Sequence, residues 1–141
     1  MGALLRRVFA VARAGRELAA VLWVASKMEW SLRTEGIEQS MARAGAHLAT
    51  KADDRDQVGS LPGWAKRRIR LVNKVYRYWP LGDTCLRRSL VIAQRLSPLK
   101  PSIVFAARLE NDALLAHSWV RIRGIDLDEN PERYQILEGL G

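Results

Sequence analysis

Cysteine and histidine are the scarcest chemically active residues of this chain. Its 141 residues include one cysteine, Cys85, and two histidines, His47 and His117. One chain with these three side chains can form neither a disulfide framework nor a four-ligand Cys/His zinc site. A phosphate-binding Gly-x-x-x-x-Gly-Lys motif and a clustered set of carboxylates are also missing, so we expect no metal and no nucleotide cofactor. The single thiol is either buried filler or a nucleophile.

Long uncharged apolar runs are missing as well. Residues 1–25 are rich in apolar side chains, but five charged residues interrupt them before a membrane-spanning length is reached. These residues are Arg6, Arg7, Arg13, Arg16 and Glu17. They also fall where the apolar core of a secretory signal would lie. We therefore interpret the segment as part of the mature protein and, with so little cysteine, expect a cytoplasmic location.

The same segment has the spacing of one helix face. Its apolar positions recur at steps of three or four residues: Leu4, Val8, Val11, Gly15, Leu18 and Leu22. Packing of this face on the protein core is one interpretation. The other is an arginine-bearing amphipathic helix that rests on a membrane surface or on a partner protein. The sequence leaves both open, so a peripheral membrane location stays among the expectations.

Size and composition favour one globular domain. Hydrophobic residues make up 48% of the chain and charged residues 27%, and a chain of this length buries enough surface for a core. We expect a helical region at residues 1–49, a loop at 50–63 and one compact unit at 64–141. Within the helical region, apolar spacing over residues 37–48 predicts a second helix, with His47 at or near its apolar edge.

The charge balance is basic, with 23 lysines and arginines against 15 aspartates and glutamates. Residues 64–79 combine apolar side chains at helical spacing with a set of cations and no acid. The cations are Lys66, Arg67, Arg68, Arg70, Lys74 and Arg77. Such a helix can bind nucleic-acid phosphates, contact an acidic peptide or protein, or present an ordinary solvated face. Charge alone does not choose among these.

Cys85 stands at the start of a predicted helix. Asp83 or Thr84 is a good N-cap, and apolar residues follow at helical spacing from Leu86 onward. In a first helical turn, the unpaired backbone amides and the positive end of the helix favour a thiolate over a thiol. A lone cysteine in a helix is nevertheless more often a small buried hydrophobe. A nucleophilic role for Cys85 therefore needs support from other residues of the chain.

That support comes from two predicted strands. Residues 102–109 alternate in the manner of a strand, and residues 114–124 alternate again after a turn. The second strand places His117 and Trp119 on one face. A cysteine at a helix start, a histidine on a strand and an acid on the adjoining strand are the parts of a cysteine-histidine-acid nucleophilic site.

Two aspartates compete for the role of the acid. Asp126 and Asp128 are the first acids after His117. If Arg123 and Gly124 form a tight two-residue turn, Arg121 lies opposite Asp126, and Asp128 lies nearer to the histidine. Its shorter distance to His117 therefore favours Asp128 as the acid, with Asp126 as the alternative.

The second half of the chain resembles the lasso peptide leader peptidases, which are transglutaminase-like cysteine proteases. The resemblance rests on Cys-Leu-x-Arg-Ser-Leu at residues 85–90 and Ala-His-x-Trp-Val at residues 116–120, followed by a glycine and an acid. It implies an α+β fold of the papain and transglutaminase type. A catalytic helix and a small antiparallel sheet would then follow the N-terminal helical region.

The resemblance also implies a function. Cys85 would attack the bond between leader and core of a precursor peptide, His117 would act as the base and Asp128 would orient it, with an acyl-enzyme as intermediate. Arg88 matches the family's arginine and is a candidate structural tie or substrate contact, and Arg87 is expected to face solvent. Trp119 either packs beneath the catalytic ring or stacks on substrate.

The resemblance further implies partners. A separate leader-recognition protein would bind the precursor peptide, since this chain is short for a peptidase and that module together. An ATP-dependent lasso cyclase would use the freed core peptide, and no nucleic acid would take part. Two other interpretations stay open: a basic nucleic-acid-binding module, and a transglutaminase-like acyltransferase or inactive scaffold.

Overall fold

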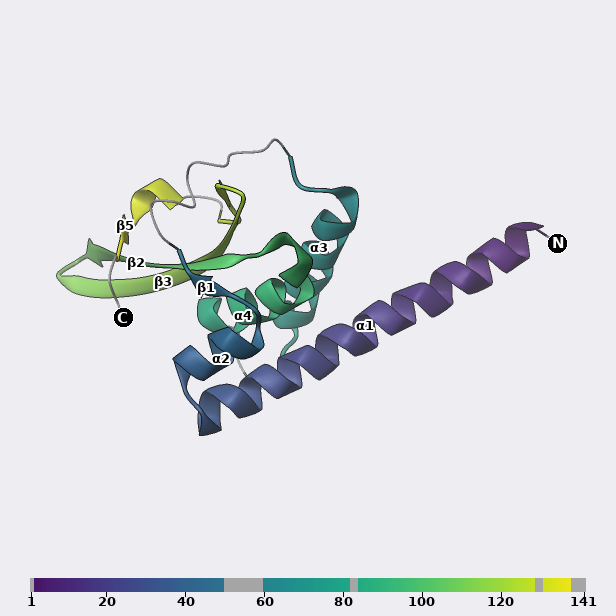
Figure 1. Ribbon diagram of the computed structural model, residues 1–141, viewed down its shortest axis with the longest axis horizontal. Helices are drawn as coiled ribbons and strands as arrows, with labels where there is room; N and C mark the ends of the chain where they lie inside the picture. The colour runs from purple at the N-terminus through teal and green to yellow at the C-terminus, as the bar shows by residue number, and fades with distance from the viewer. Residues whose placement is uncertain (1, 50–59, 82–83, 129–130, 138–141) are drawn as a thin grey trace.

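The computed structural model of the chain describes residues 2–49, 60–81, 84–128 and 131–137. Its helices are α1 (Gly2–Thr34), α2 (Ile37–Arg43), α3 (Gly63–Arg77) and α4 (Cys85–Arg95), with short 3-10 turns at Ser97–Leu99 and Pro131–Arg133. Its strands are β1 (His47–Leu48), β2 (Ser102–Glu110), β3 (Ala113–Ile122), β4 (Ile125–Asp126) and β5 (Gln135–Ile136). The helices lie against one side of a small mixed sheet, which makes this an α+β fold (Figure 1). Most of the predicted 50–63 loop, and the N-cap candidate Asp83, fall outside the described residues.

The long antiparallel hairpin of β2 and β3 is the centre of the sheet. β4 continues from β3 through Arg123 and Gly124, whose φ angles of 51° and 75° both lie in the left-handed region that a tight hairpin turn requires. The register pairs Arg121 with Asp126 and Ile122 with Ile125, which confirms the predicted two-residue turn. On the far edge, β1 runs parallel to β2 and β5 runs antiparallel to it.

The main core lies between the helices and one face of the hairpin. α4 has a strongly one-sided distribution of apolar residues, so it buries its Leu90 side against the sheet and the neighbouring helices. The fully buried members of this core include Val72, Leu90, Leu96, Ile103, Val120 and Ile122. A smaller cluster on the opposite face of the sheet contains Val104, Ala106 and Trp119. The hairpin is therefore covered on both faces near the candidate histidine.

The first half of α1 does not pack on the core, so that interpretation of its apolar face is wrong. Val21, Ala25 and Met28 are the buried apolar residues by which α1 joins the core, and Val24 and Leu32 pack against it partly buried. They all lie in the second half of α1, whereas Leu4, Val8, Val11 and Leu18, toward the N-terminus, are exposed. Figure 1 shows the reason: α1 is longer than the body it crosses, and its N-terminal turns extend beyond the other elements.

We expect Arg87 to face solvent from the sequence, but the structure shows that it does not. Its Nε lies 2.8 Å from Oε2 of Glu29 in α1, and its Nη2 donates to Oε1 at 3.1 Å. Glu29 is only 6% exposed and also pairs with Arg33. A carboxylate buried to this degree requires cationic partners, so Arg87 joins the start of α4 to α1.

The predicted second helix over residues 37–48 is too long. α2 ends at Arg43, because Gly45 adopts a left-handed φ of 67° that a helix cannot continue through. His47 and Leu48 then form β1 beside Ser102 and Ile103 of β2. A short apolar run fits a helix or a strand equally well, and the free edge of β2 decided the outcome here. His47 is exposed on this strand.

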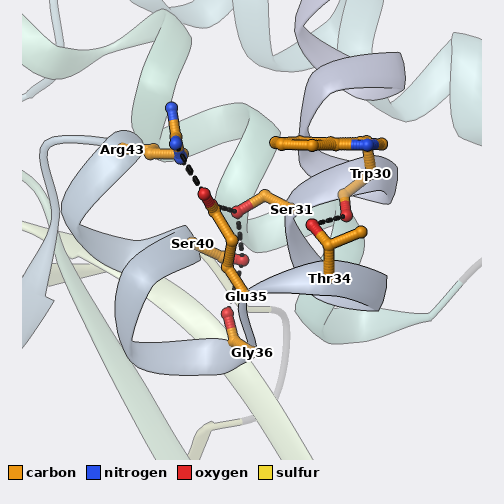
Figure 2. Close-up of polar contacts among 7 residues, drawn as sticks. All are labelled: Trp30, Ser31, Thr34, Glu35, Gly36, Ser40 and Arg43. Atoms are coloured by element: carbon orange, nitrogen blue, oxygen red, sulfur yellow. Dashed lines mark hydrogen bonds and ion pairs between the residues drawn. The ribbon is translucent and has the colours of Figure 1, made fainter.

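A polar network fixes the corner between α1 and α2 (Figure 2). Arg43 donates two hydrogen bonds of 2.6 Å, one to each carboxylate oxygen of Glu35, and Ser31 donates a third at 2.9 Å. The hydroxyls of Ser31 and Ser40 lie 2.8 Å apart in the interior. Hydrogen bonding by Arg43 lowers the pKa of Glu35 below its ordinary value and raises the pKa of Arg43 above its own.

The network predicts a specific loss of stability in acid. A depressed carboxyl pKa contributes stability that is present above the ordinary pKa and is lost as pH falls through the depressed one. We therefore expect the melting temperature to fall more between about pH 5 and pH 3 in the wild type than in Glu35→Gln. Glu38→Gln, an exposed change on α2, is the control and should follow the wild type. Parallel curves for all three proteins would contradict the role of Glu35.

Candidate active site

Cys85, His117 and Asp128 line one pocket with a volume of about 440 Å³. The pocket lies where the first turn of α4 meets the edge of β3. His117 and Trp119 belong to the face of β3 that is turned away from α4, and Ser118 belongs to the opposite face. All of them line the pocket, so it wraps around the strand edge.

The sequence around Cys85 places its thiol at a helix start. Thr84 has extended backbone angles, and its Oγ1 accepts a hydrogen bond of 3.3 Å from the amide of Arg87, so Thr84 is the N-cap. Cys85 is the first residue of α4 and is half-buried. Its backbone amide belongs to the first turn of α4 and so has no acceptor within its own helix.

His117 is held from several sides. Its Nε2 lies 2.9 Å from Oδ1 of Asp128. Its ring also contacts Tyr134, with ring centroids 4.7 Å apart, and Trp119, with ring centroids 5.6 Å apart. Because Nε2 is occupied by the carboxylate, Nδ1 is the ring nitrogen left to exchange a proton with a thiol.

The two candidate acids have different partners. Asp126 accepts from the indole nitrogen of Trp119 at 2.8 Å and from Nε of Arg121 at 2.7 Å. Asp128 is the one that contacts His117. The β3-β4 hairpin produces this division, since Leu127 donates to the carbonyl of Val120 and keeps the register beyond the last strand pair. The position of Asp128 thus agrees with the reach argument made from the turn.

Ser89 connects the cysteine helix to the histidine strand. Its hydroxyl lies 2.7 Å from the carbonyl oxygen of Cys85 and 3.3 Å from the carbonyl oxygen of Ser118. Ser89 is 4% exposed, so this contact is shielded from water. It fixes the start of α4 against the residue that follows His117.

Trp119 and Arg88, the two predicted substrate contacts, are placed differently. Trp119 is 3% exposed and its indole nitrogen is bound by Asp126, so it packs beneath the imidazole and leaves little surface for a substrate. Arg88 lines the pocket one helical turn into α4. Its location allows contact with a bound peptide.

Sequence reasoning missed Tyr134 and two further arginines of the pocket. Tyr134 lies against His117, and the guanidinium of Arg108 sits 5.2 Å from the centre of the Tyr134 ring. Arg133 also lines the pocket. Tyr134 follows a short 3-10 turn without apolar periodicity, so nothing in the local pattern indicated that it would return to the site. With Arg88, these residues make the pocket rich in arginine.

No group of three or more potential metal ligands occurs among the residues that the structure describes. The pocket brings together a thiol, an imidazole and a carboxylate, with several arginine side chains around them. A thiol that shares a pocket with an imidazole held by an acid is suited to nucleophilic attack on a carbonyl carbon.

Comparison with known proteins agrees with this arrangement. Residues 22–139 match the transglutaminase-like superfamily, and the match includes α4, the whole sheet and the C-terminal part of α1 from residue 22 onward. Searches among curated proteins and among solved structures gave no significant match. Because the family match covers most of the chain and contains every residue of the candidate site, the chain belongs to the transglutaminase-like superfamily.

Proposed function

We propose that this protein is a cysteine protease that removes the leader from a lasso peptide precursor. Transglutaminase-like domains are typically cysteine proteases or acyltransferases, so a catalytic thiol is the common element. The observation that carries the proposal is the pocket that Cys85 shares with the hydrogen-bonded pair of His117 and Asp128. The two sequence motifs that resemble leader peptidases contain Cys85 and His117.

The first half of the reaction forms an acyl-enzyme. His117 takes the proton of the Cys85 thiol on Nδ1, and Asp128 stabilises the resulting imidazolium through Nε2. The thiolate attacks the carbonyl carbon at the leader-core junction, and the Cys85 amide donates to the developing oxyanion. The carbon-nitrogen bond then breaks, His117 returns the proton to the leaving amine, and the leader remains on sulfur as a thioester.

The second half releases the leader. His117 removes a proton from water, the hydroxide adds to the thioester carbonyl, and the carbon-sulfur bond breaks. The leader leaves with a free carboxylate and Cys85 recovers its proton. An acyltransferase would carry out the same first half and use an amine in place of water.

Product masses distinguish the protease from the acyltransferase. Incubation of a leader-bearing precursor with the protein should give a leader fragment with a terminal carboxylic acid and a core with a free amine. The same fragment joined to an added primary amine, with no free acid, would replace the protease by an acyltransferase. An unchanged precursor mass in the presence of all partners would reject both.

A partner protein should accelerate this cleavage. We infer that the precursor is delivered by a separate leader-recognition protein, since the motifs of the resemblance lie in the catalytic unit alone. Delivery raises the local concentration of the peptide at the pocket, so we expect cleavage at least about tenfold faster when that protein is added. Equal rates at peptide concentrations well below saturation, with and without it, would contradict the inference.

The basic helix α3 does not favour nucleic acid over the protease. Arg68 is half-buried and engaged by the protein itself, since it donates to the carbonyl of Arg95 at 2.9 Å and its guanidinium lies over the Trp64 ring. The remaining α3 cations are exposed, as on an ordinary solvated face.

A further inference from the structure

The first half of α1 is a helix without a partner. Every described residue from 2 to 16 is exposed, although the segment contains several large apolar side chains. Phe9 is 67% exposed, Val11 73% and Trp23 68%. No helix in the described part of the chain is long and apolar enough to cross a membrane. The segment nevertheless exposes an amount of apolar surface that soluble monomers rarely leave uncovered.

Most of the exposed apolar residues form one continuous arc, and Phe9 lies just outside it, beyond Arg16. At 3.6 residues per turn, the positions between Leu4 and Trp23 that lie on this side fall within roughly 140° of the helix circumference. They are Leu4, Leu5, Val8, Val11, Ala12, Gly15, Leu18, Ala19, Leu22 and Trp23. No charged residue falls within the arc, which extends about 28 Å along the helix. The side that approaches α3 carries Ala10, Ala14 and Glu17 and lies elsewhere on the helix.

The charges beside the arc are all positive. Arg7 and Arg16 flank its two edges, and Arg6 and Arg13 lie on the opposite side. Glu17, the one acid in the first 28 residues, pairs with Arg68 and Arg95. Burial opposes ionisation of Glu17, but these two arginines outweigh it and lower its pKa, so the carboxylate is committed to the body of the protein. A surface that binds the arc and complements these charges must therefore be anionic.

Two features argue against a second copy of the chain as the partner that covers the arc. Two such helices would bring their arginines together with no acid to offset them, because Glu17 is already paired. The arc is also wider than the seam of a two-stranded coiled coil, so Leu5 and Trp23 would stay exposed in a dimer. Gly15 at the centre of the arc supplies no side chain to such a seam.

We propose that the N-terminal half of α1 lies in the interfacial plane of a bilayer that contains anionic phospholipids. The apolar arc enters the acyl boundary, and Arg7 and Arg16 reach lipid phosphates along its edges while their aliphatic stems stay in apolar surroundings. Trp23 is suited to the headgroup level, where aromatic side chains are stable. This binding does not depend on the thiol chemistry, so it can hold or fail independently of the proposed function.

Vesicle flotation of the full chain tests the proposal. The probes are vesicles of phosphatidylcholine alone and of phosphatidylcholine with phosphatidylglycerol, at low and high salt. Val8→Glu/Val11→Glu places two charges in the arc, and Ala10→Glu/Ala14→Glu places the same two charges off the arc in the same helical turns. All four positions are exposed, so circular dichroism should show wild-type helix content in both variants. Ala10 and Ala14 line a pocket with Arg67 and Arg68 of α3, so the melting temperature is measured for each variant and binding is compared where both are folded.

We expect the wild type to float with anionic vesicles and to be released by salt. The Val8→Glu/Val11→Glu variant should bind at least about tenfold more weakly, with a much smaller loss in Ala10→Glu/Ala14→Glu. Three results would overturn the proposal: no flotation at low salt, equal binding to uncharged vesicles, or equal losses in both variants. A monomer-dimer shift caused by Val8→Glu/Val11→Glu, or an acidic protein that binds the arc in place of lipid, would also overturn it.

Discussion

Cys85→Ser should lower cleavage of a leader-bearing precursor by at least about 10³-fold. Cys85 is the sole sulfur nucleophile of the chain, and a serine hydroxyl at the same place is a much weaker nucleophile next to an imidazole. The loss should appear in the turnover number, because the substitution leaves the shape of the pocket nearly unchanged. Peptide cleavage followed by mass spectrometry gives the rate.

The control for this substitution is to verify that the variant keeps the wild-type fold. Circular dichroism and melting temperature should match the wild type, since Thr84 still caps α4 and Ser89 still contacts the backbone of residue 85. Alkylation of the wild-type protein, which has one thiol, should produce the same loss without any mutation. A folded Cys85→Ser protein that retains more than about a tenth of the wild-type rate would remove the thiol from the mechanism.

The two aspartates of the β4 region should separate activity from stability. Asp128→Ala removes the carboxylate that contacts His117, so turnover should fall by about 10²-fold or more while the free energy of unfolding changes little. Asp126→Ala removes the acceptor for Trp119 and Arg121, which are both almost fully buried, and should cost about 2 kcal/mol of stability. Its effect on turnover should be the smaller of the two.

Matched measurements decide this comparison. Both variants should remain folded by circular dichroism at a temperature well below their melting points, and cleavage is measured there. Asp128→Asn should also be slow, because an amide cannot stabilise the imidazolium as a carboxylate does. If Asp126→Ala were the slower enzyme, the orienting role would pass to Asp126.

The elements that carry the site could be predicted from local pattern. The helix from Cys85 and the two strands each have a clear apolar periodicity of one kind, and Thr84 is a good capping residue. Tertiary packing therefore did not change the secondary structure that the local sequence predicts. The contact of Asp128 with His117 was indicated by the hairpin register, because a two-residue turn at Arg123 and Gly124 leaves only one alignment of β3 with β4.

Other features depend on contacts that the local sequence does not contain. Arg87 lies on the side of α4 that meets α1, and its partner Glu29 is distant in sequence. Tyr134 reaches His117 from a segment without periodicity. The apolar face of α1 has the same spacing whether it is covered or exposed, and only the extent of the body determines which. In each case the outcome depends on where distant segments meet, which periodicity does not specify.

The reactivity of Cys85 toward iodoacetamide tests most directly whether the pocket holds a working nucleophile and base. The measurement requires no substrate, and the single thiol makes intact mass a clean readout. At about pH 6.5 we expect alkylation of the wild type to be at least tenfold faster than alkylation of His117→Ala, with Asp128→Asn between them. Identical rates in the folded wild type and the folded His117→Ala variant would contradict the pairing of Cys85 with His117 and, with it, the proposed mechanism.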